Sequence, residues 1–206
     1  MVTITALKPQ RNGKRVNVYL DGKFAFGIDL DNLVLSGLKI DKQFSEEEIE
    51  KIIKKAEFQK TLDKLLKFAT LRPRSEKEIR DWFKRKKVHE SLHKELFNRL
   101  NRLELVDDKK FAKWWVEQRI AFRPKGKGGL NYELRGKGIK QEIINEILQD
   151  SPIDEEKSAR QLLEKVSYKW KDLPNREARQ KKAQYLARKG FSWDVITRFL
   201  KIDQGG

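Results

Sequence analysis

A short string recurs three times in the chain, and this repeat constrains the fold more than any other feature. The copies occupy residues 83–88, 134–139 and 186–191, at offsets of 51 and 52 residues. The same apolar spacing follows each copy: Val88, Leu92 and Leu96; Ile139, Ile143 and Ile147; Phe191, Val195 and Phe199. Spacing of four residues is typical of one face of a helix. The pattern predicts three tandem helical modules; the alternative is a single compact bundle in which the spacing is coincidental.

Each module is expected to hold three helices: a long one, a short one that ends at a Lys-Gly or Lys-Lys step, and one that carries the apolar spacing. Gly138 and Gly190 stand where the short helix should end, and glycine adopts the required left-handed conformation at low cost. Lys87 lacks that freedom, which predicts a different turn in the first module. Candidate capping residues close or open the modules: Asp107, Asp154 and Asp203. A three-helix unit buries little by itself, so neighbouring modules should stack into a quasi-linear array.

The N-terminal segment has a different period. Residues 15–20 alternate polar and apolar side chains, Asp21-Gly22 follows, and residues 23–28 form a second short run. This arrangement predicts a β-hairpin, with residues 3–7 as a candidate third strand. Two capping boxes, at residues 45–48 and 75–78, each predict a helix start. The expected organisation is a β-hairpin plus helix over residues 1–58, followed by helical repeats over 59–106, 107–153 and 154–206.

Charge restricts the class of partner. The 206 residues include 47 Lys and Arg against 31 Asp and Glu, a net charge of +16. Residues 1–58 hold ten basic and nine acidic residues, so almost all of the excess belongs to 59–206. Such an excess predicts an anionic partner, most often a nucleic-acid backbone; an anionic membrane or an acidic protein face are the alternatives. The absence of cysteine excludes disulfides and thiolate chemistry. Without a signal sequence or a long apolar run, a soluble cytoplasmic protein is expected.

Two stretches concentrate the positive charge. The first patch comprises Arg72, Arg74, Lys84, Arg85, Lys86 and Lys87. The second comprises Arg123, Lys125, Lys127, Arg135, Lys137 and Lys140, with Glu133 as the one acid among them. Both are candidate phosphate-contacting surfaces, and solvated helix faces are the alternative. Residues 126–129 read as a flexible basic loop, because the spacing of a nucleotide-binding P-loop is missing. Reversing the charge of Lys125, Lys127 and Lys137 is expected to weaken binding to an anionic partner.

Histidine and aromatic residues give weaker signals. His89 and His93 fit the two-histidine string of zinc hydrolases, but the chain has no other histidine. Val88, Leu92 and Leu96 form the predicted buried stripe, which leaves the two histidines beside it in solvent, so neither a metal nor a cofactor is expected. Core positions are predicted for Trp82, Phe111 and Trp115. Trp114 and Trp115 project about 100° apart on a helix, which predicts that they do not share one core and that one is exposed.

Four strings together resemble the RecX regulatory proteins, bacterial modulators of the RecA recombinase. The strings lie at residues 72–79, 107–119, 126–139 and 185–191, and the resemblance runs from residue 62 to residue 200. It implies a mainly α fold, an elongated array of three tandem three-helix repeats behind a small N-terminal β-hairpin. Arg119 belongs to the second string and is a candidate binding residue, with pairing to an acid inside the repeat as the alternative.

The resemblance also implies a function. RecX-like proteins have no known catalytic activity, bind RecA, and lie along the groove of the RecA–DNA filament. There they block filament growth or promote disassembly, which lowers recombinase, ATPase and coprotease activity and thereby affects DNA repair and the SOS response. A monomeric, non-enzymatic regulator of RecA is therefore expected, with contacts to the nucleic-acid backbone. The alternative is a helical-repeat protein that binds DNA directly and independently of RecA.

Overall fold

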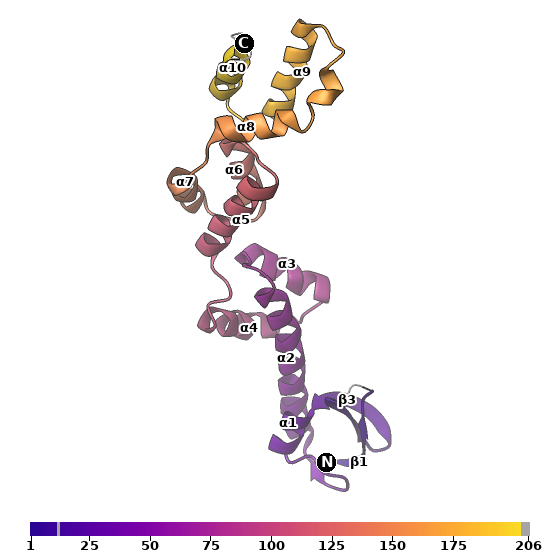
Figure 1. Cartoon of the computed structure of the whole chain (residues 1–206). Helices are drawn as coiled ribbons and strands as arrows, with labels where there is room; N and C mark the ends of the chain where they lie inside the picture. The colour runs from indigo at the N-terminus through magenta and orange to yellow at the C-terminus, as the bar shows by residue number, and fades with distance from the viewer. Residues whose placement is uncertain (12, 203–206) are drawn as a thin grey trace. The chain divides into compact units, whose positions relative to one another are not determined.

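The computed structural model describes residues 1–11 and 13–202 and is mainly α-helical, with a small N-terminal sheet (Figure 1). The chain divides into two compact units. The first unit consists of Met1–Leu71 and Lys86–Leu103, and the second consists of Arg72–Arg85 and the described part of Glu104–Gly206. The fold class predicted from the sequence is thus confirmed. The boundaries proposed for the repeats stay a prediction.

The N-terminal sheet has four antiparallel strands in the order β3-β2-β1-β4. Their bounds are β1 Val2–Pro9, β2 Arg15–Leu20, β3 Lys23–Asp29 and β4 Gln43–Phe44. The β2–β3 turn has positive φ angles at Asp21 (48°) and Gly22 (83°), as the predicted hairpin requires. One core buries Ile4, Val18 and Ile28 of the sheet together with Ile49 and Ala56. The hairpin is confirmed, and β1 and β4 extend it.

Three helices complete the first unit: α1 Leu30–Leu35, α2 Glu46–Thr70 and α4 Glu90–Arg102. The predicted capping box starts α2, because Ser45 Oγ accepts from the Glu48 amide and the Glu48 carboxylate accepts from the Ser45 amide. The first half of α2 packs on the sheet through Ile49 and Ala56, and α4 packs against α2. The length of α2, 25 residues, joins the sheet and α4 into a single unit.

The second unit contains the remaining helices. They are α3 Glu76–Lys86, α5 Asp108–Phe122, α6 Lys127–Gly136, α7 Gln141–Asp150, α8 Glu155–Glu164, the 3₁₀ helix Ser167–Trp170, α9 Asn175–Arg188 and α10 Trp193–Ile202. Helices α5–α7 enclose one apolar core and α8–α10 another. The predicted apolar spacing is buried at Ile139, Ile147 and Phe191, whereas the Phe199 side chain lies outside the described residues. In residues 1–11 and 13–202, no helix is both long and apolar enough to cross a membrane.

The helix ends agree with the predicted caps, except at the turn that contains Lys87. Asp107 accepts from the amides of Lys109 and Lys110 at the start of α5, and Asp154 caps α8 in the same way. Asp203 lies outside the described residues. Gly138 and Gly190 both have a φ of 82° after their helices, as expected. Lys87 has a φ of 51°, so the prediction of a different turn was wrong: the first copy makes the same left-handed turn with a residue that is strained there.

The glycines at residues 126–129 form a joint between modules, and the prediction of a flexible loop was wrong. Lys127, Gly128 and Gly129 are the first turn of α6. The Gly129 amide donates to the Gly190 carbonyl at 3.3 Å, and the Gly126 amide donates to the Lys189 carbonyl at 3.2 Å. A Cβ on Gly129 would lie 2.4 Å from the Lys189 oxygen. Glycine is therefore required because two backbones meet directly.

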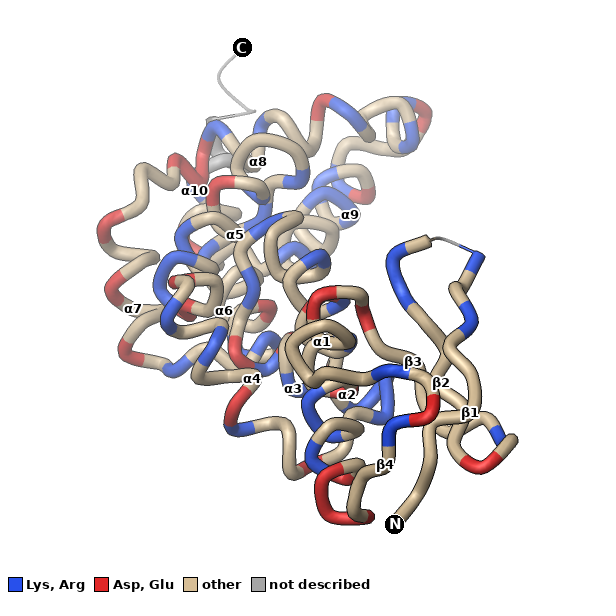
Figure 2. The backbone as a smooth tube through the Cα atoms, turned by 90° about the horizontal axis from the view of Figure 1, so that it is seen from below, with Lys and Arg blue, Asp and Glu red and all other residues tan. Residues whose placement is uncertain are grey.

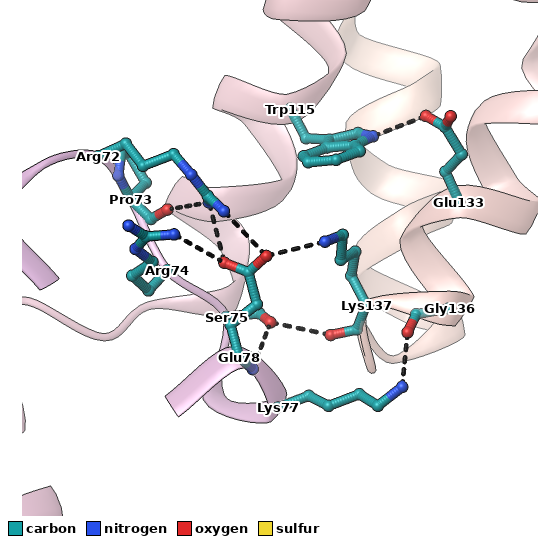
Figure 3. Close-up of polar contacts among 10 residues, drawn as sticks. All are labelled: Arg72, Pro73, Arg74, Ser75, Lys77, Glu78, Trp115, Glu133, Gly136 and Lys137. Atoms are coloured by element: carbon teal, nitrogen blue, oxygen red, sulfur yellow. Dashed lines mark hydrogen bonds and ion pairs between the residues drawn. The ribbon is translucent and has the colours of Figure 1, made fainter. Parts of the chain in front are cut away.

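An equivalent joint connects α3 to the turn between α6 and α7 (Figure 3). Ser75 Oγ donates to the Lys137 carbonyl at 2.9 Å, and Lys77 Nζ donates to the Gly136 carbonyl at 2.7 Å. In both joints the start of a module's second helix packs on the Lys-Gly turn of the next module. Only half of the second predicted capping box forms, because Ser75 Oγ accepts from the Glu78 amide while the Glu78 carboxylate binds other groups.

Candidate nucleic-acid interface

Three cations of the predicted patches converge on one carboxylate, Glu78 of α3 (Figure 3). Arg72 binds it with both terminal nitrogens, Nη1 to Oε2 at 2.9 Å and Nη2 to Oε1 at 3.0 Å. Lys137 Nζ lies 2.8 Å from Oε1, and Arg74 Nη1 lies 3.7 Å from Oε2. The Glu78 side chain is 12% exposed and that of Arg74 is 9% exposed. These four residues, the Glu78 cluster, join the start of α3 to the end of α6.

The electrostatics of the Glu78 cluster favour the ionised carboxylate. Burial alone would raise the pKa of Glu78, but the hydrogen bonds from Arg72 and Lys137 outweigh it and lower the pKa below its ordinary value. Burial also lowers the pKa of Arg74, and the charge of the neighbouring Arg72 acts in the same direction. The carboxylate therefore stays charged at neutral pH and holds cations that would otherwise repel one another.

A second carboxylate, Glu133 of α6, gathers two more of the predicted cations. Arg119 Nε lies 2.7 Å from Oε2, and Lys125 Nζ lies 2.6 Å from Oε1. The indole nitrogen of Trp115 donates to Oε2 at 2.8 Å. Burial opposes ionisation of Glu133, but the hydrogen bonds from Arg119, Lys125 and Trp115 lower its pKa overall. Arg119 therefore pairs with an acid inside the repeat, as the alternative has it, and its role as a binding residue stays a prediction.

Aromatic rings of α5 connect the two clusters. The Arg72 guanidinium carbon lies 5.0 Å from the centre of the Trp114 ring, and that of Arg119 lies 4.4 Å from the Trp115 ring. Lys137 Nζ, bound to Glu78, is 4.8 Å from the Trp115 ring. Cations at these distances are attracted to the ring faces. The two clusters together hold five cations and two carboxylates, a net charge of +3, and three of the cations lie over the two indoles.

The two tryptophans lie differently from the prediction. Both are half-buried, and both pack against the core of α5–α7 beside Phe111, so the prediction that they do not share one core and that one is exposed was wrong. The ring centres of Phe111, Trp114 and Trp115 form a triangle with sides of 5.6–6.1 Å, so both indoles reach the same phenyl ring although their Cα–Cβ bonds diverge. Phe111 and Trp82 are buried in the core, as predicted.

The remaining eight predicted residues are exposed: Lys84, Arg85, Lys86, Lys87, Arg123, Lys127, Arg135 and Lys140. The thirteen predicted residues therefore separate into five cations that hold α3, α5 and α6 together and eight that face solvent. Figure 2 shows both basic and acidic positions along the helices of the second unit. An anion that contacts these exposed cations would leave the ion pairs of Glu78 and Glu133 intact.

Residues that the sequence analysis did not select also belong to this region. Glu78 and Glu133 organise the cations, and the position of Glu133 as the one acid between Arg123 and Lys140 was the available signal. Tyr132 is 82% exposed on α6 and lies three residues from Arg135, so the two share one side of the helix. An exposed aromatic ring beside a cation is typical of surfaces that bind nucleic acids.

The two histidines of the zinc-hydrolase string do not share a helix face. His89 precedes α4 as its N-cap, and its Nδ1 accepts from the Ser91 amide. His93 lies in the helix, and its Nε2 is 3.0 Å from the Val88 carbonyl oxygen. Among residues 1–11 and 13–202, no group of three His, Cys, Asp or Glu side chains is placed to hold a metal ion. His89 is exposed, as predicted, whereas His93 is half-buried.

Three family models match the chain. The model of the N-terminal domain of regulatory protein RecX matches residues 2–45. The models of the second and third three-helix domains of RecX match residues 107–148 and 154–200. The matched regions cover the N-terminal sheet with α1, most of α5–α7 and most of α8–α10.

Curated proteins and solved structures agree with these matches. The chain is 38% identical to regulatory protein RecX of Bacillus licheniformis over 98% of this chain and 77% of the relative. It is 36% identical to that of Bacillus subtilis, over 96% and 75%, and 29% identical to that of Clostridium acetobutylicum, over 97% and 95%. A crystal structure of regulatory protein RecX matches with a TM-score of 0.68 and 28% identity, over 98% of this chain and 100% of the other. RecX from Lactobacillus salivarius matches with a TM-score of 0.60 and 25% identity, over 71% and 96%.

Proposed function

Because the chain belongs to the RecX regulatory protein family, we propose that it binds RecA and RecA–DNA filaments and inhibits recombinase, ATPase and coprotease activity without being an enzyme itself. Inhibition would also affect DNA repair and the SOS response. The observation that carries the proposal is the exposed set of cations around the Glu78 and Glu133 clusters. A nucleoprotein filament presents DNA phosphates, and a fixed positive surface is attracted to them over several ångströms.

The chemistry of the clusters supports a binding role over catalysis. Catalytic carboxylates that transfer protons near neutral pH usually have raised pKa values. The pKa values of Glu78 and Glu133 are lowered instead, and both carboxylates are occupied by cations. They are suited to position positive charge rather than to donate or accept a proton.

The test is a titration of DNA-dependent ATP hydrolysis by RecA with substoichiometric amounts of the protein. We expect inhibition that excess DNA does not relieve, because the protein acts on the filament. If it only competes with RecA for DNA, excess DNA will restore hydrolysis. No effect at any ratio would contradict the proposal.

Charge reversal at exposed positions tests the surface. The variant Arg123→Glu, Lys127→Glu, Arg135→Glu should need at least about tenfold more protein for half inhibition, since the loss of even one charged contact costs about 1.4 kcal/mol or more. Lys125 and Lys137 are unsuitable, because their reversal would also break the ion pairs with Glu133 and Glu78.

A matched control changes three exposed cations of the third module by the same charge: Lys165→Glu, Arg176→Glu and Lys181→Glu. Equal losses in the two variants would show that only net charge matters, and the residue assignment would be wrong.

Direct DNA binding without RecA is the second candidate function. Tyr132 beside Arg135 favours it, because an exposed ring can stack on a base while the guanidinium contacts a phosphate. Relief of inhibition by excess DNA, together with tight binding to DNA alone, would support this candidate in place of the first.

A further inference from the structure

The first unit contains a basic groove that the sequence analysis did not indicate. The groove has a volume of about 830 Å³ and lies between the start of β2, α1 and the middle of α2. Its cationic lining residues are Lys14, Arg15, Lys55, Lys60, Lys64 and Lys67. By sequence, three of these lysines fall in the basic part of the chain after residue 58. The structure places them beside the N-terminal sheet, whose own segment is almost neutral.

The lysines of α2 are available to a ligand. Four of them are exposed: Lys55, Lys60, Lys64 and Lys67. Within residues 1–11 and 13–202, none of these four forms an ion pair. This differs from the second unit, where five of the predicted cations are held by Glu78 and Glu133. These four lysines of α2 therefore present ammonium groups whose charge is not compensated by an ion pair among the described residues.

Two of the three acids at the groove are engaged in local hydrogen bonds. The Asp29 carboxylate caps α1, accepting from the amide and the side chain of Asn32 at 2.9–3.1 Å. Asp63 accepts from the Gln59 side chain at 2.8 Å. With Asp31, the lining holds six cations against three acids, a net charge of +3.

The spacing of the lysines fits a nucleic-acid strand. Lys60, Lys64 and Lys67 follow at i, i+4 and i+7, which places them on one side of α2. At 1.5 Å per residue they span about 10 Å of the helix. A duplex strand rises about 3.4 Å per nucleotide, so this span matches about three nucleotide steps along one strand. The helix holds the three positions in a fixed row, which reduces the ordering cost of binding.

We propose that this groove binds the phosphate backbone of a nucleic-acid strand, as a second site in addition to the exposed cations of the second unit. Lysine is a common phosphate ligand that acts as a point charge. None of the residues that line the groove is aromatic, so contacts to the backbone are expected and stacking on bases is not. Binding there is therefore independent of base sequence and strongly dependent on salt.

The experiment measures binding of the full chain to a fluorescein-labelled 20-base single strand and to a 20-base-pair duplex at several salt concentrations, with no RecA present. The groove variant is Lys60→Gln, Lys64→Gln, Lys67→Gln, and glutamine keeps the helix propensity of α2. A plot of log K against log salt has a negative slope. Three lost phosphate contacts should make that slope less steep, by about 2.7 for the duplex and about 2.1 for the single strand. Thermal unfolding followed by circular dichroism verifies that the variant is folded.

The matched control removes three exposed lysines of the same unit that do not line the groove: Lys23→Gln, Lys51→Gln and Lys54→Gln. Its slope should equal that of the original chain. An unchanged slope in the groove variant, or an equal fall in the control, would overturn the proposal. Poly-glutamate serves as a second probe. If the groove variant loses binding to poly-glutamate while its DNA slope is unchanged, the groove binds an acidic polypeptide and the proposal is also overturned. Since RecA is absent, failure of the RecA proposal leaves this result unaffected.

Discussion

Replacing Glu78 by glutamine removes the charge that holds Arg72, Arg74 and Lys137 together while it keeps the shape of the side chain. Glutamine can still accept a hydrogen bond, but three cations then face one another around a neutral group. Breaking a fully buried ion pair costs about 3–5 kcal/mol. Glu78 and Arg74 are nearly buried, whereas Arg72 is 27% and Lys137 is 32% exposed, so solvent screens part of the loss. We expect the second unit to lose about 2–3 kcal/mol.

The chain offers a selective reporter for this measurement. All five tryptophans belong to the second unit: Trp82, Trp114, Trp115, Trp170 and Trp193. Urea unfolding followed by tryptophan fluorescence therefore reports on the unit that contains Glu78, without signal from the first unit. The free energy of unfolding of the variant is compared with that of the original chain at pH 7.

Glu76→Gln is the matched control. Glu76 lies in the same first turn of α3, so its interaction with the helix dipole is similar. Its ion pair with Arg80 is exposed, at 49% and 61%, and such pairs contribute about 0.5 kcal/mol or less. If Glu78→Gln costs no more than Glu76→Gln, the carboxylate does not organise these cations and the reasoning about the cluster is refuted.

Three further predictions follow from the structure. Glu78 and Glu133 have lowered pKa values in the folded chain, so the stability that they contribute is fully present above the unfolded pKa of about 4.5 and is lost as the pH falls through the folded pKa values. The urea concentration at half unfolding, measured by tryptophan fluorescence, should therefore decrease below about pH 4.5, and a flat pH profile would contradict this. Gly129→Ala should lower the free energy of unfolding by about 1–3 kcal/mol in the same assay, because the new Cβ would meet a carbonyl oxygen. Gly136→Ala, which has open space around its Cβ, should raise it by up to about 1 kcal/mol, and equal effects of the two changes would argue against the joint. Lys87→Gly should stabilise the chain by about 0.5–1 kcal/mol in urea unfolding followed by circular dichroism, and a loss would show that the left-handed turn is not strained.

The repeat, the hairpin and the helix caps could be predicted because each depends on neighbouring residues. The apolar spacing after residues 88, 139 and 191 reports the buried side of a helix whatever it packs against. Asp21-Gly22 and Ser45 act on the backbone within three residues of themselves. Such local effects are encoded in short strings, so the sequence indicates them directly.

The role of each cation could not be predicted, because it depends on which carboxylate the fold brings near. Lys137 and Glu78 are 59 residues apart and meet only through the joint between α3 and the turn after α6. Arg119 and Glu133 meet because α5 and α6 pack on a common core. Composition indicates an excess of positive charge, but the division into internal and exposed cations follows from these contacts.

By itself, the sequence determined that this chain is a series of helical modules behind a β-element, with an excess of positive charge and a resemblance to one family. Only the tertiary structure decided that five cations stabilise the second unit, that residues 127–129 begin a helix, and that Lys60, Lys64 and Lys67 line a groove beside the N-terminal sheet. The physical reason is range: helix period, turns and caps act over a few residues, whereas ion pairs, backbone joints and grooves require segments distant in the sequence to be close in space.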